Sequence, residues 1–303
     1  MRAMVLAAGL GTRLRPLTDE LPKPVVPVGN RPLAAYALEH LARLGVTDVV
    51  LNTHHLGDRV RERLVPAAPP GMALTFLHEP VLLGTGGGLA NARAHLVHGD
   101  EPVLVVNGDV LFEPRLAEAL ALHVRLGAIA TMVLRAHPDA ARFGAVEIDD
   151  TSRVRRLLGK PVDAPAPLRA HMFTGVHVLS PRAFAHFPAE GCVIRSAYRA
   201  WVDRGETVAG FVDDSPWRDL GTPAEYLAAN VALAAAAPNR AIVAPSAQVA
   251  LSATLVDCVV GPGARVAPHV TLERVVLWDG AFADHSLIDT ILTPLARVSA
   301  REG

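Results

Sequence analysis

The chain has 303 residues, of which 50% are hydrophobic and 19% are charged, and its net charge is −1. This composition is typical of a globular protein, and the absence of a basic excess argues against a nucleic-acid partner or an anionic membrane surface. Two cysteines are too few for a disulfide framework or a zinc site, and no apolar run approaches the roughly 20 residues of a bilayer span. Because the short apolar strand after Arg2 runs directly into a glycine loop, there is no room for a signal peptide, and we expect a cytoplasmic protein.

Short apolar runs alternate with longer amphipathic stretches from residue 1 to about residue 235. The runs predict strands and the stretches predict helices, of which two begin with Pro32 and Pro114, residues that suit a first helical turn. Strands separated by helices form a mostly parallel sheet covered on both faces, so we expect a Rossmann-like α/β fold. The expected strands are Ala3–Ala8, Asp48–Asn52, Ala73–Leu77, Val103–Val106, Ile129–Arg135, Ala145–Ile148 and Val176–Leu179. The expected helices are Pro32–Leu44, Gly57–Leu64, Gly88–Leu96 and Pro114–Leu126.

The pattern changes around residues 234–239, after which aliphatic residues recur in groups six positions apart, with a step of five between groups and with Gly, Pro and small residues between them. A six-residue period is typical of a hexapeptide β-helix, which we expect to be left-handed with coils of about 17 residues. Three coils leave an apolar end and flank uncovered, so we expect this tail to contact another chain, as a homo-oligomer, or the domain that precedes it. The predicted inward residues are Val243, Val249, Leu255, Val260, Val266, Leu272, Leu277 and Ala283.

The motif with the clearest chemistry is Gly9-Leu10-Gly11, which follows the first expected strand. Two glycines separated by one residue let backbone N–H groups curl around an anion. Arg13 and Lys23 add two positive charges, which suits a polyphosphate. A dinucleotide-binding turn would need a third glycine where Leu14 stands, and its helix would contain Pro16, so local sterics disfavour it. We therefore predict a triphosphate site at this loop.

One aspartate follows an expected strand end, and a second lies in a glycine-containing turn in a distant part of the chain. Asp109 ends the motif Asn107-Gly108-Asp109, and Asp219 lies in the glycine-containing stretch 217–222. Each alone would be read as a cap or turn residue. Mg²⁺ is commonly held by one or two carboxylates, with phosphate oxygens and water completing an octahedron. Together with the triphosphate loop, Asp109 and Asp219 therefore predict a Mg²⁺ cofactor.

Four glycines stand close together in Gly84-Thr85-Gly86-Gly87-Gly88, directly before the helix expected to continue to Leu96. Such a stretch indicates backbone that approaches a flat or bulky ligand, because a packed core has no need of this gap in side chains. A flexible turn is the alternative. We predict a ligand-bordering loop here.

With Arg13, Thr18 and Pro22-Lys23-Pro24 included, the N-terminal motif resembles the long signature of the sugar-1-phosphate nucleotidyltransferases. The resemblance covers roughly residues 1–235 and, in the tail, 240–295, which implies a nucleotidyltransferase domain at 1–238 and a short β-helix at 239–303. It implies a reaction of an NTP with a sugar 1-phosphate that gives an NDP-sugar and pyrophosphate. The Gly-Thr-Gly-Gly-Gly pattern and the short tail look most like bacterial mannose-1-phosphate guanylyltransferases, which use GTP.

The resemblance also implies roles for individual residues. Glu79 lies near a base-reading position, where a carboxylate would accept from guanine, or equally from uracil or thymine. Gly159 stands where many relatives have a Glu that contacts sugar hydroxyls, which leaves the sugar undefined. The implied catalytic residues are Arg13, Lys23 and Lys160. The implied nucleotide-binding residues are Ala7, Ala8, Gly9, Gly11, Thr12, Arg13, Glu79, Gly84, Thr85 and Gly86. The sugar-phosphate residues are Asn107, Gly108, Lys160, Thr174 and Gly175, and the metal ligands are Asp109 and Asp219.

Three alternatives stay open. N-acetylmuramate-1-phosphate uridylyltransferases and glucose-1-phosphate thymidylyltransferases share most of these motifs. A non-catalytic NDP-sugar-binding regulatory subunit would be expected to lack Arg13, Lys23 or a metal aspartate, and all are present. A tail with acyltransferase activity is disfavoured by only three coils, in which His269 and His285 are the only candidate bases.

Overall fold

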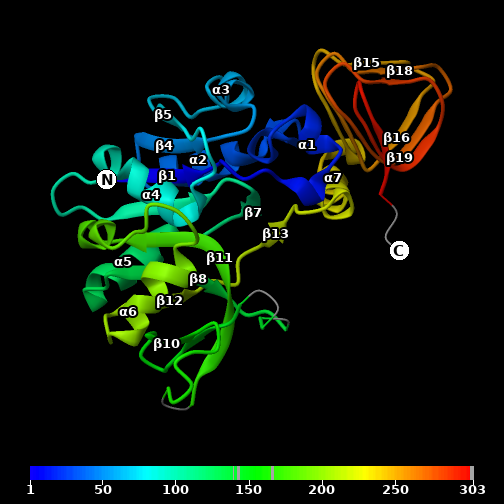
Figure 1. Cartoon of the computed structure of the whole chain (residues 1–303). Helices are drawn as coiled ribbons and strands as arrows, with labels where there is room; N and C mark the ends of the chain where they lie inside the picture. The colour runs from blue at the N-terminus through cyan, green and yellow to red at the C-terminus, as the bar shows by residue number, and fades with distance from the viewer. Residues whose placement is uncertain (139, 142–143, 165–166, 301–303) are drawn as a thin grey trace. The chain divides into compact units, whose positions relative to one another are not determined.

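The computed structural model describes residues 1–138, 140–141, 144–164 and 167–300 (Figure 1). Its backbone contacts divide the chain into two compact units, each assembled from separate stretches of sequence. Unit 1 comprises residues 1–9, 36–57 and 68–217, and unit 2 comprises residues 10–35, 58–67 and those from 218 onwards.

A nine-stranded sheet with the order β10-β9-β11-β6-β1-β4-β5 forms the centre of unit 1, and β8 and β12 continue it beside β11. Strand β1 is parallel to β4 and β6, β4 is parallel to β5, and β8 is parallel to β12. Strand β11 runs antiparallel to β6, β8 and β9. The sheet is therefore rich in parallel strands, which confirms the predicted α/β class. Its strands are β1 (Arg2–Leu6), β4 (Asp48–Thr53), β5 (Ala73–His78), β6 (Val103–Asn107), β8 (Ala130–Arg135), β9 (Val146–Ile148), β10 (Val154–Leu157), β11 (Arg169–Leu179) and β12 (Val208–Val212).

Helices pack on this sheet because its central strands are apolar on both faces. Met4 and Val105 are completely buried, as are Leu89 of α4 and Trp201 of α6, and all four belong to one hydrophobic core. Helix α4 contacts β1 and β4, α5 contacts β8 and β12, and α6 contacts β10. The helices of the chain are α1 (Leu17–Glu20), α2 (Leu33–Arg43), α3 (Gly57–Leu64), α4 (Gly84–Leu96), α5 (Leu116–Leu126), α6 (Arg199–Asp203) and α7 (Pro223–Ala236).

All of the strands and helices predicted for residues 1–235 are present, but several of their ends differ. Helix α4 begins at Gly84 rather than at Gly88, and β11 begins at Arg169 rather than at Val176. The two predicted helix-starting prolines are wrong: Pro114 precedes α5, which begins at Leu116, and Pro32 belongs to the short strand β3 (Arg31–Pro32). Strands β7 (Val110–Phe112), β10, β12 and β13 (Trp217–Asp219) and helices α1, α6 and α7 were missed, since their short or alanine-rich sequences lack a clear hydrophobic period. Asp219 is therefore the last residue of a strand and not part of a turn.

Parallel strands stacked in coils make up the C-terminal part of unit 2, and Figure 1 shows their triangular outline. The register advances by one coil of 17 residues, as in Ala241↔Cys258 and Gln248↔Arg265, which matches the predicted length. The last turn is shorter, since Leu272 pairs with Leu287. This arrangement is consistent with a β-helix. Its strands are β14 (Ala241–Val243), β15 (Gln248–Val249), β16 (Thr254–Val256), β17 (Cys258–Val260), β18 (Arg265–Val266), β19 (Thr271–Leu277), β20 (Phe282–Ala283), β21 (Leu287–Leu292) and the antiparallel β22 (Arg297–Ser299).

The inward positions of the coils agree with the predicted six-residue period, apart from the first. Val260, Val266, Leu272, Leu277 and Ala283 are buried, and Val249 and Leu255 are half-buried against them. The exception is Val243, which is 42% exposed although it is in register with Val260. Its strand β14 is at the end of its ladder, so only one neighbouring strand covers it. The flank of the coils is covered by α7, which contacts β14, β17, β19 and β21.

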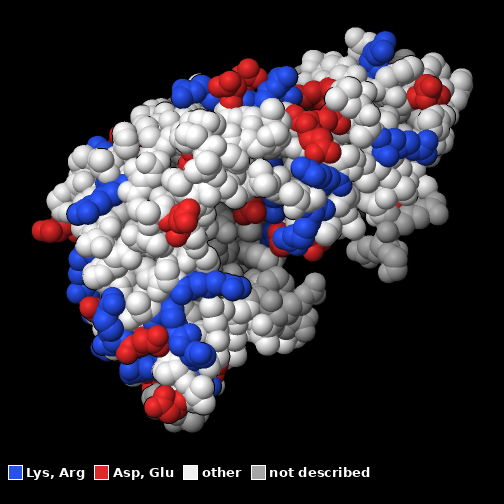
Figure 2. Space-filling model, viewed as in Figure 1, with Lys and Arg blue, Asp and Glu red and all other residues white. Residues whose placement is uncertain are grey.

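Charged side chains of both signs are interspersed over the face that Figure 2 shows, in line with the near-zero net charge. Among the described residues, no helix combines the length and hydrophobicity that crossing a membrane requires.

Candidate functional site

The glycine loop of unit 2 is closed tightly against the lysine that follows it. Gly11 has φ +61°, and a Cβ added there would lie 2.9 Å from Thr18 Cγ2 and 3.0 Å from Lys23 Cβ. The Thr18 hydroxyl donates a hydrogen bond to the Gly11 carbonyl at 3.0 Å. Only glycine fits this conformation and this spacing, which explains the second glycine of the motif. The structure thus brings the loop and Lys23 together, as predicted.

Asp219 joins Arg13 and Lys23 in one charged cluster. Its Oδ2 accepts from Arg13 Nη2 at 3.3 Å, and its Oδ1 accepts from Lys23 Nζ at 3.3 Å. The side chain of Arg13 is 67% exposed, whereas that of Lys23 is 5% exposed. The guanidinium and the ammonium are charged donors of the kind that bind phosphate oxygens. Three of the predicted site residues therefore meet in unit 2.

Gly221 allows Arg13 to reach this cluster. A Cβ at position 221 would lie 2.6 Å from Arg13 Nη1 and 2.8 Å from its Cζ, inside any permitted contact distance. The guanidinium therefore lies against bare backbone. The sequence motif around Asp219 contained this glycine, but nothing in the sequence indicated that Arg13 packs on it.

In unit 1, the carboxyl ends of the central strands lie in register. Leu6, the last residue of β1, pairs with Asn52 of β4 on one side and with Asn107 of β6 on the other. The Gly108 N–H donates to the Leu6 carbonyl at 2.9 Å, which fixes the start of the Asn107-Gly108-Asp109 turn. Asp109 follows in this turn and is half-buried. The predicted placement of these residues at a strand end is therefore confirmed.

A bulge in β11 brings the Thr174-Gly175 pair next to Asn107. The register of β11 against β8 shifts between Phe173 and His177, and Gly175 has φ +87°. A Cβ at Gly175 would lie 2.7 Å from Asn107 Nδ2, so this glycine makes room for the asparagine side chain. Thr174 is buried, and its hydroxyl donates to the Val133 carbonyl at 2.8 Å.

Glu79 is fully buried and both of its carboxylate oxygens have partners in the protein. Oε1 accepts from Asn52 Nδ2 at 2.8 Å, and Oε2 accepts from the Leu83 N–H at 3.1 Å, at the start of α4. The Asn52 Oδ1 accepts in turn from the Ala7 N–H at 2.9 Å. This chain of contacts ties the end of β1 to α4. Asn52 was missed by sequence reasoning, because an asparagine at a strand end carries no distinctive signal.

The glycines at the start of α4 make room for another segment of the chain itself. A Cβ at Gly84 would lie 2.7 Å from the Gly191 carbonyl oxygen, and one at Gly87 would lie 2.4 Å from that of Ala189. The Gly86 N–H donates to the Gly191 carbonyl at 2.8 Å, and the Thr85 hydroxyl accepts from the backbone N–H of residue 193 at 3.0 Å. The expectation that packing would not need such a gap was wrong, because a backbone segment fills it.

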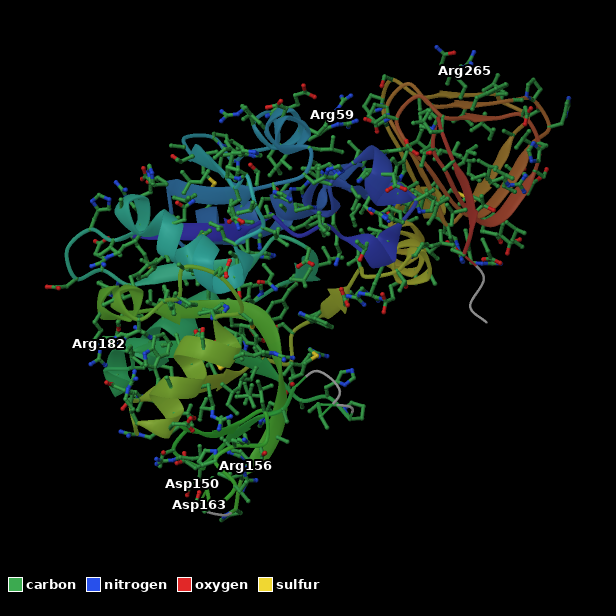
Figure 3. All side chains as sticks on the ribbon, in the orientation of Figure 1. Arg59, Asp150, Arg156, Asp163, Arg182 and Arg265 are labelled. Carbon is green, nitrogen blue, oxygen red and sulfur yellow. The ribbon has the colours of Figure 1, made fainter. Side chains whose placement is uncertain are left out.

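Lys160 is exposed at a tight turn that follows β10. Leu158 and Gly159 both have positive φ values, and the Lys160 N–H and carbonyl both bond to Leu157. Arg156, labelled in Figure 3, donates from Nε to the Pro161 carbonyl at 3.0 Å and from Nη1 to a carboxylate oxygen of Glu147 at 2.9 Å. The backbone around Lys160 is thus braced although its side chain faces solvent.

The family model for nucleotidyl transferases matches residues 2–236. The chain belongs to the nucleotidyl transferase family. It is 33% identical over 291 residues to the mannose-1-phosphate guanylyltransferase of Mycobacterium tuberculosis, covering 92% of this chain and 80% of that protein. It is 33% identical over 231 residues to the mannose-1-phosphate guanyltransferase of Schizosaccharomyces pombe, covering 75% of this chain but only 62% of that protein.

Among solved structures, HddC from Yersinia pseudotuberculosis in complex with GMP-PN matches with a TM-score of 0.62 at 23% sequence identity. The match covers 75% of this chain and 97% of HddC. At this identity the likeness establishes the fold alone.

In this nucleotidyl transferase, the predicted site residues fall into two sets. Unit 1 groups Ala7 with Glu79, and Asn107 with Gly175, whereas unit 2 groups Gly11, Arg13, Lys23 and Asp219. Asp109 belongs to unit 1 and Asp219 to unit 2. The described residues contain no cluster of three or more His, Cys, Asp or Glu side chains that would bind a metal by themselves. A metal held by one or two carboxylates together with substrate phosphates needs no such cluster.

Proposed function

We propose that this nucleotidyl transferase joins an NTP to a sugar 1-phosphate, and that its substrates are GTP and mannose 1-phosphate. The observation that carries the proposal is the cluster of Arg13, Lys23 and Asp219 against the glycine loop. Its two cations and one carboxylate suit a polyphosphate with a bound divalent ion. The choice of guanine and mannose is supported by the names of the Mycobacterium and Schizosaccharomyces relatives and by the GMP-PN bound to HddC.

In the proposed reaction, a phosphate oxygen of the sugar 1-phosphate forms a bond to the α-phosphorus of the NTP. The bond between that phosphorus and the oxygen bridging to the β-phosphate breaks, and pyrophosphate leaves. The second pKa of a phosphate monoester is about 6, so the attacking oxygen is already deprotonated at neutral pH and no general base is required. Catalysis therefore requires alignment of two anions and neutralisation of the charge on the leaving group.

We assign these tasks to the chain's own cations. Arg13, which is exposed, and the backbone of residues 9–12 hold the β- and γ-phosphates. Lys23 is nearly buried and has little freedom, which suits a fixed charge at the reacting phosphate. Lys160, exposed on its braced turn, binds the incoming sugar phosphate. Asp109 and Asp219 are the proposed Mg²⁺ ligands, and Mg²⁺ bound there would neutralise phosphate charge.

The surroundings of Glu79 support an indirect role in reading the base. Its two oxygens already bond to Asn52 and to the N–H of Leu83. We therefore infer that Glu79 holds the backbone of Ala7 and the start of α4 in place, and that backbone groups near residues 84–86 contact the base. Asn107, Gly108 and the Thr174-Gly175 pair are proposed to border the sugar phosphate.

We retain the division into a nucleotidyltransferase domain at 1–238 and a β-helix at 239–303, which is supported by the end of the family match at residue 236. A left-handed coil, a cytoplasmic location and a homo-oligomer formed through the coils also remain proposals. Exposed apolar side chains on the coils, Leu251, Phe282 and Leu295, support a contact with another chain.

Pyrophosphate release, measured for each pair of common NTPs and sugar 1-phosphates, tests the proposal. We expect the highest kcat/KM for GTP with mannose 1-phosphate, and loss of turnover when EDTA removes divalent ions. A preference for UTP with N-acetylmuramate 1-phosphate, or for dTTP with glucose 1-phosphate, would replace the proposed substrates but leave the reaction. Binding of an NDP-sugar with no turnover of any pair would refute the reaction and favour a regulatory subunit.

A further inference from the structure

The segment that carries Lys23 is rich in proline and leads into a short hairpin. Pro22, Pro24 and Pro27 have no backbone N–H, so these residues cannot donate to any hydrogen-bond ladder. The segment ends in a two-stranded hairpin, β2 (Pro27–Val28) with β3, whose turn residues Gly29 and Asn30 have φ values of +55° and +65°. Residues 23–25 form a short 3-10 turn, in which the Val25 N–H donates to the Pro22 carbonyl and the Val26 N–H donates to the Lys23 carbonyl. The hairpin that follows is also held by groups from elsewhere in the fold.

A buried chain of hydrogen bonds connects this hairpin to the C-terminal coils. Trp278, in the turn after β19, donates from Nε1 to the Tyr226 hydroxyl at 2.9 Å, and that hydroxyl donates to the Pro27 carbonyl. Tyr226 is completely buried and Trp278 is 3% exposed. Burial raises the pKa of Tyr226, so its hydroxyl remains protonated and able to donate. Trp278 thus acts on the Lys23 segment through a single intervening side chain.

The tip of the hairpin is held twice more. The Gly29 N–H donates to Asn230 Oδ1 at 2.9 Å, and Asn30 Nδ2 donates to the Val260 carbonyl at 2.9 Å. Asn230 is fully buried and its own amide donates to the Tyr226 carbonyl at 3.0 Å. Helix α7 and strand β17 therefore fix the hairpin between them, and Val260 belongs to the core of the coils.

These contacts bear on the charge at Lys23. A lysine ammonium sits on a flexible four-carbon stem, so its position depends on where the backbone and the neighbouring groups hold it. Here the ammonium is held by Asp219 at 3.3 Å, and the hairpin that begins four residues after Lys23 restrains the backbone that leads out of its turn. If the hairpin loosens, the backbone restraint is lost, and a displacement of about 1 Å at a reacting centre can lower a rate 100-fold.

We propose that the C-terminal coils position Lys23 for catalysis, with Trp278 and Tyr226 as positioning residues that act through the Pro27 carbonyl. The inference rests on the proposed role of Lys23 in nucleotidyl transfer. It assigns to the coils a part in the chemistry of their own chain, in addition to any contact with another chain. Tyr226 and Trp278 touch no substrate in this scheme.

A double-mutant cycle tests the proposal in the full-length chain. Tyr226→Phe removes the hydroxyl, which leaves both the Pro27 carbonyl and the Trp278 N–H without this partner. We expect kcat at saturating substrates to fall about tenfold, equivalent to about 1.4 kcal/mol. In a Lys23→Ala background the same substitution is expected to change kcat by less than twofold, because the residue on which it acts is already gone.

Tyr198→Phe is the matched control. Tyr198 is also completely buried, and its hydroxyl bonds to His177 at 2.6 Å, within unit 1. We expect it to lower the melting temperature while leaving kcat within twofold of wild type. All rates are measured well below the melting temperature of the least stable variant, so that differences in the folded fraction do not affect the measured kcat.

The proposal is overturned if Tyr226→Phe leaves kcat within twofold of wild type, or if it lowers kcat by the same factor with and without Lys23. If Tyr226→Phe does not fold, Trp278→Phe replaces it in the double-mutant cycle. We expect Trp278→Phe to lower kcat about threefold, and to have no such effect in the Lys23→Ala background. Failure of the proposed function is a separate outcome: Lys23→Ala itself would then leave turnover unchanged.

Discussion

Gly221→Ala should misplace Arg13 without disturbing the fold. The added Cβ would lie 2.6 Å from Arg13 Nη1, whereas ordinary contacts are 3.4–4 Å, so the guanidinium must move by about 0.8 Å or more. The atoms that must move are the far end of an exposed, flexible side chain, so we expect the free energy of unfolding to change by less than about 0.5 kcal/mol.

The effect on catalysis should be much larger. A charge-assisted hydrogen bond is worth about 1.5–3 kcal/mol. This is the largest loss of transition-state stabilisation that we expect, and it applies if Arg13 loses its phosphate contact entirely. A shift of about 1 Å at a positioning group can by itself lower a rate 100-fold. We therefore expect kcat/KM for the nucleotide to fall between tenfold and 100-fold, with a smaller change in KM for the sugar 1-phosphate. Steady-state pyrophosphate release and thermal denaturation measure the two quantities.

The matched control is the same substitution in an Arg13→Ala background. Alanine at position 13 leaves room for the new methyl group, so Gly221→Ala should then change kcat/KM by less than twofold. The reasoning is refuted if Gly221→Ala alone leaves kcat/KM within twofold of wild type, or if its effect persists unchanged without the Arg13 side chain.

Three further outcomes are expected. Asp109→Asn and Asp219→Asn should each lower kcat more than 100-fold through loss of a metal ligand, and more than a tenth of wild-type kcat at saturating Mg²⁺ would contradict the metal role. Asp219→Asn should also lower the melting temperature, because it removes an ion pair of the nearly buried Lys23. Truncation after Pro238 should lower the melting temperature by at least about 4 °C, because it removes the Trp278 partner of Tyr226 and the Val260 partner of Asn30. Light scattering on the same sample reports any change in assembly, and an unchanged melting temperature would mean that these contacts do not contribute to stability. Burial lowers the pKa of His177 from 6.5 to about 3, so the stability that its neutral form contributes is complete above pH 6.5 and is lost as the pH falls from 6.5 toward 3. Urea unfolding across this range should show a decline in stability that is smaller in His177→Gln, and equal slopes in both proteins would contradict the assignment.

Local sequence signals predicted most of the framework of this protein. The apolar runs of β1, β4 and β6 are continuous because these central strands are buried on both faces, and that pattern is visible without a structure. The six-residue period of the tail was equally visible, since one buried aliphatic residue per side of each coil follows from the geometry. Strand β12 was missed because Gly210 interrupts a short run in which few residues alternate.

Site residues were predictable where a charged residue or a glycine stands in a recognisable motif. They were not predictable where the role of the residue depends on a partner that is distant in the sequence. Arg13 and Lys23 were predicted to lie together at the glycine loop, but their contacts with Asp219 depend on tertiary structure across about 200 residues of sequence. Glu79 shows a further limit of the sequence. Its place near an expected base site could be predicted, but its hydrogen bonds to Asn52 and to the backbone N–H of Leu83 are not visible in a single sequence.

The packing of residues 188–191 against the start of α4 has a consequence for protein engineering. Attempts to change nucleotide preference by adding side chains at Gly84, Gly86 or Gly87 would collide with the chain's own backbone or with Pro188, and would test folding instead of selectivity. Gly9 differs from them, since an added Cβ there meets no heavy atom of the described chain within 4 Å. A side chain at position 9 would therefore fit sterically, whereas the α4 glycines are best left unchanged in such experiments.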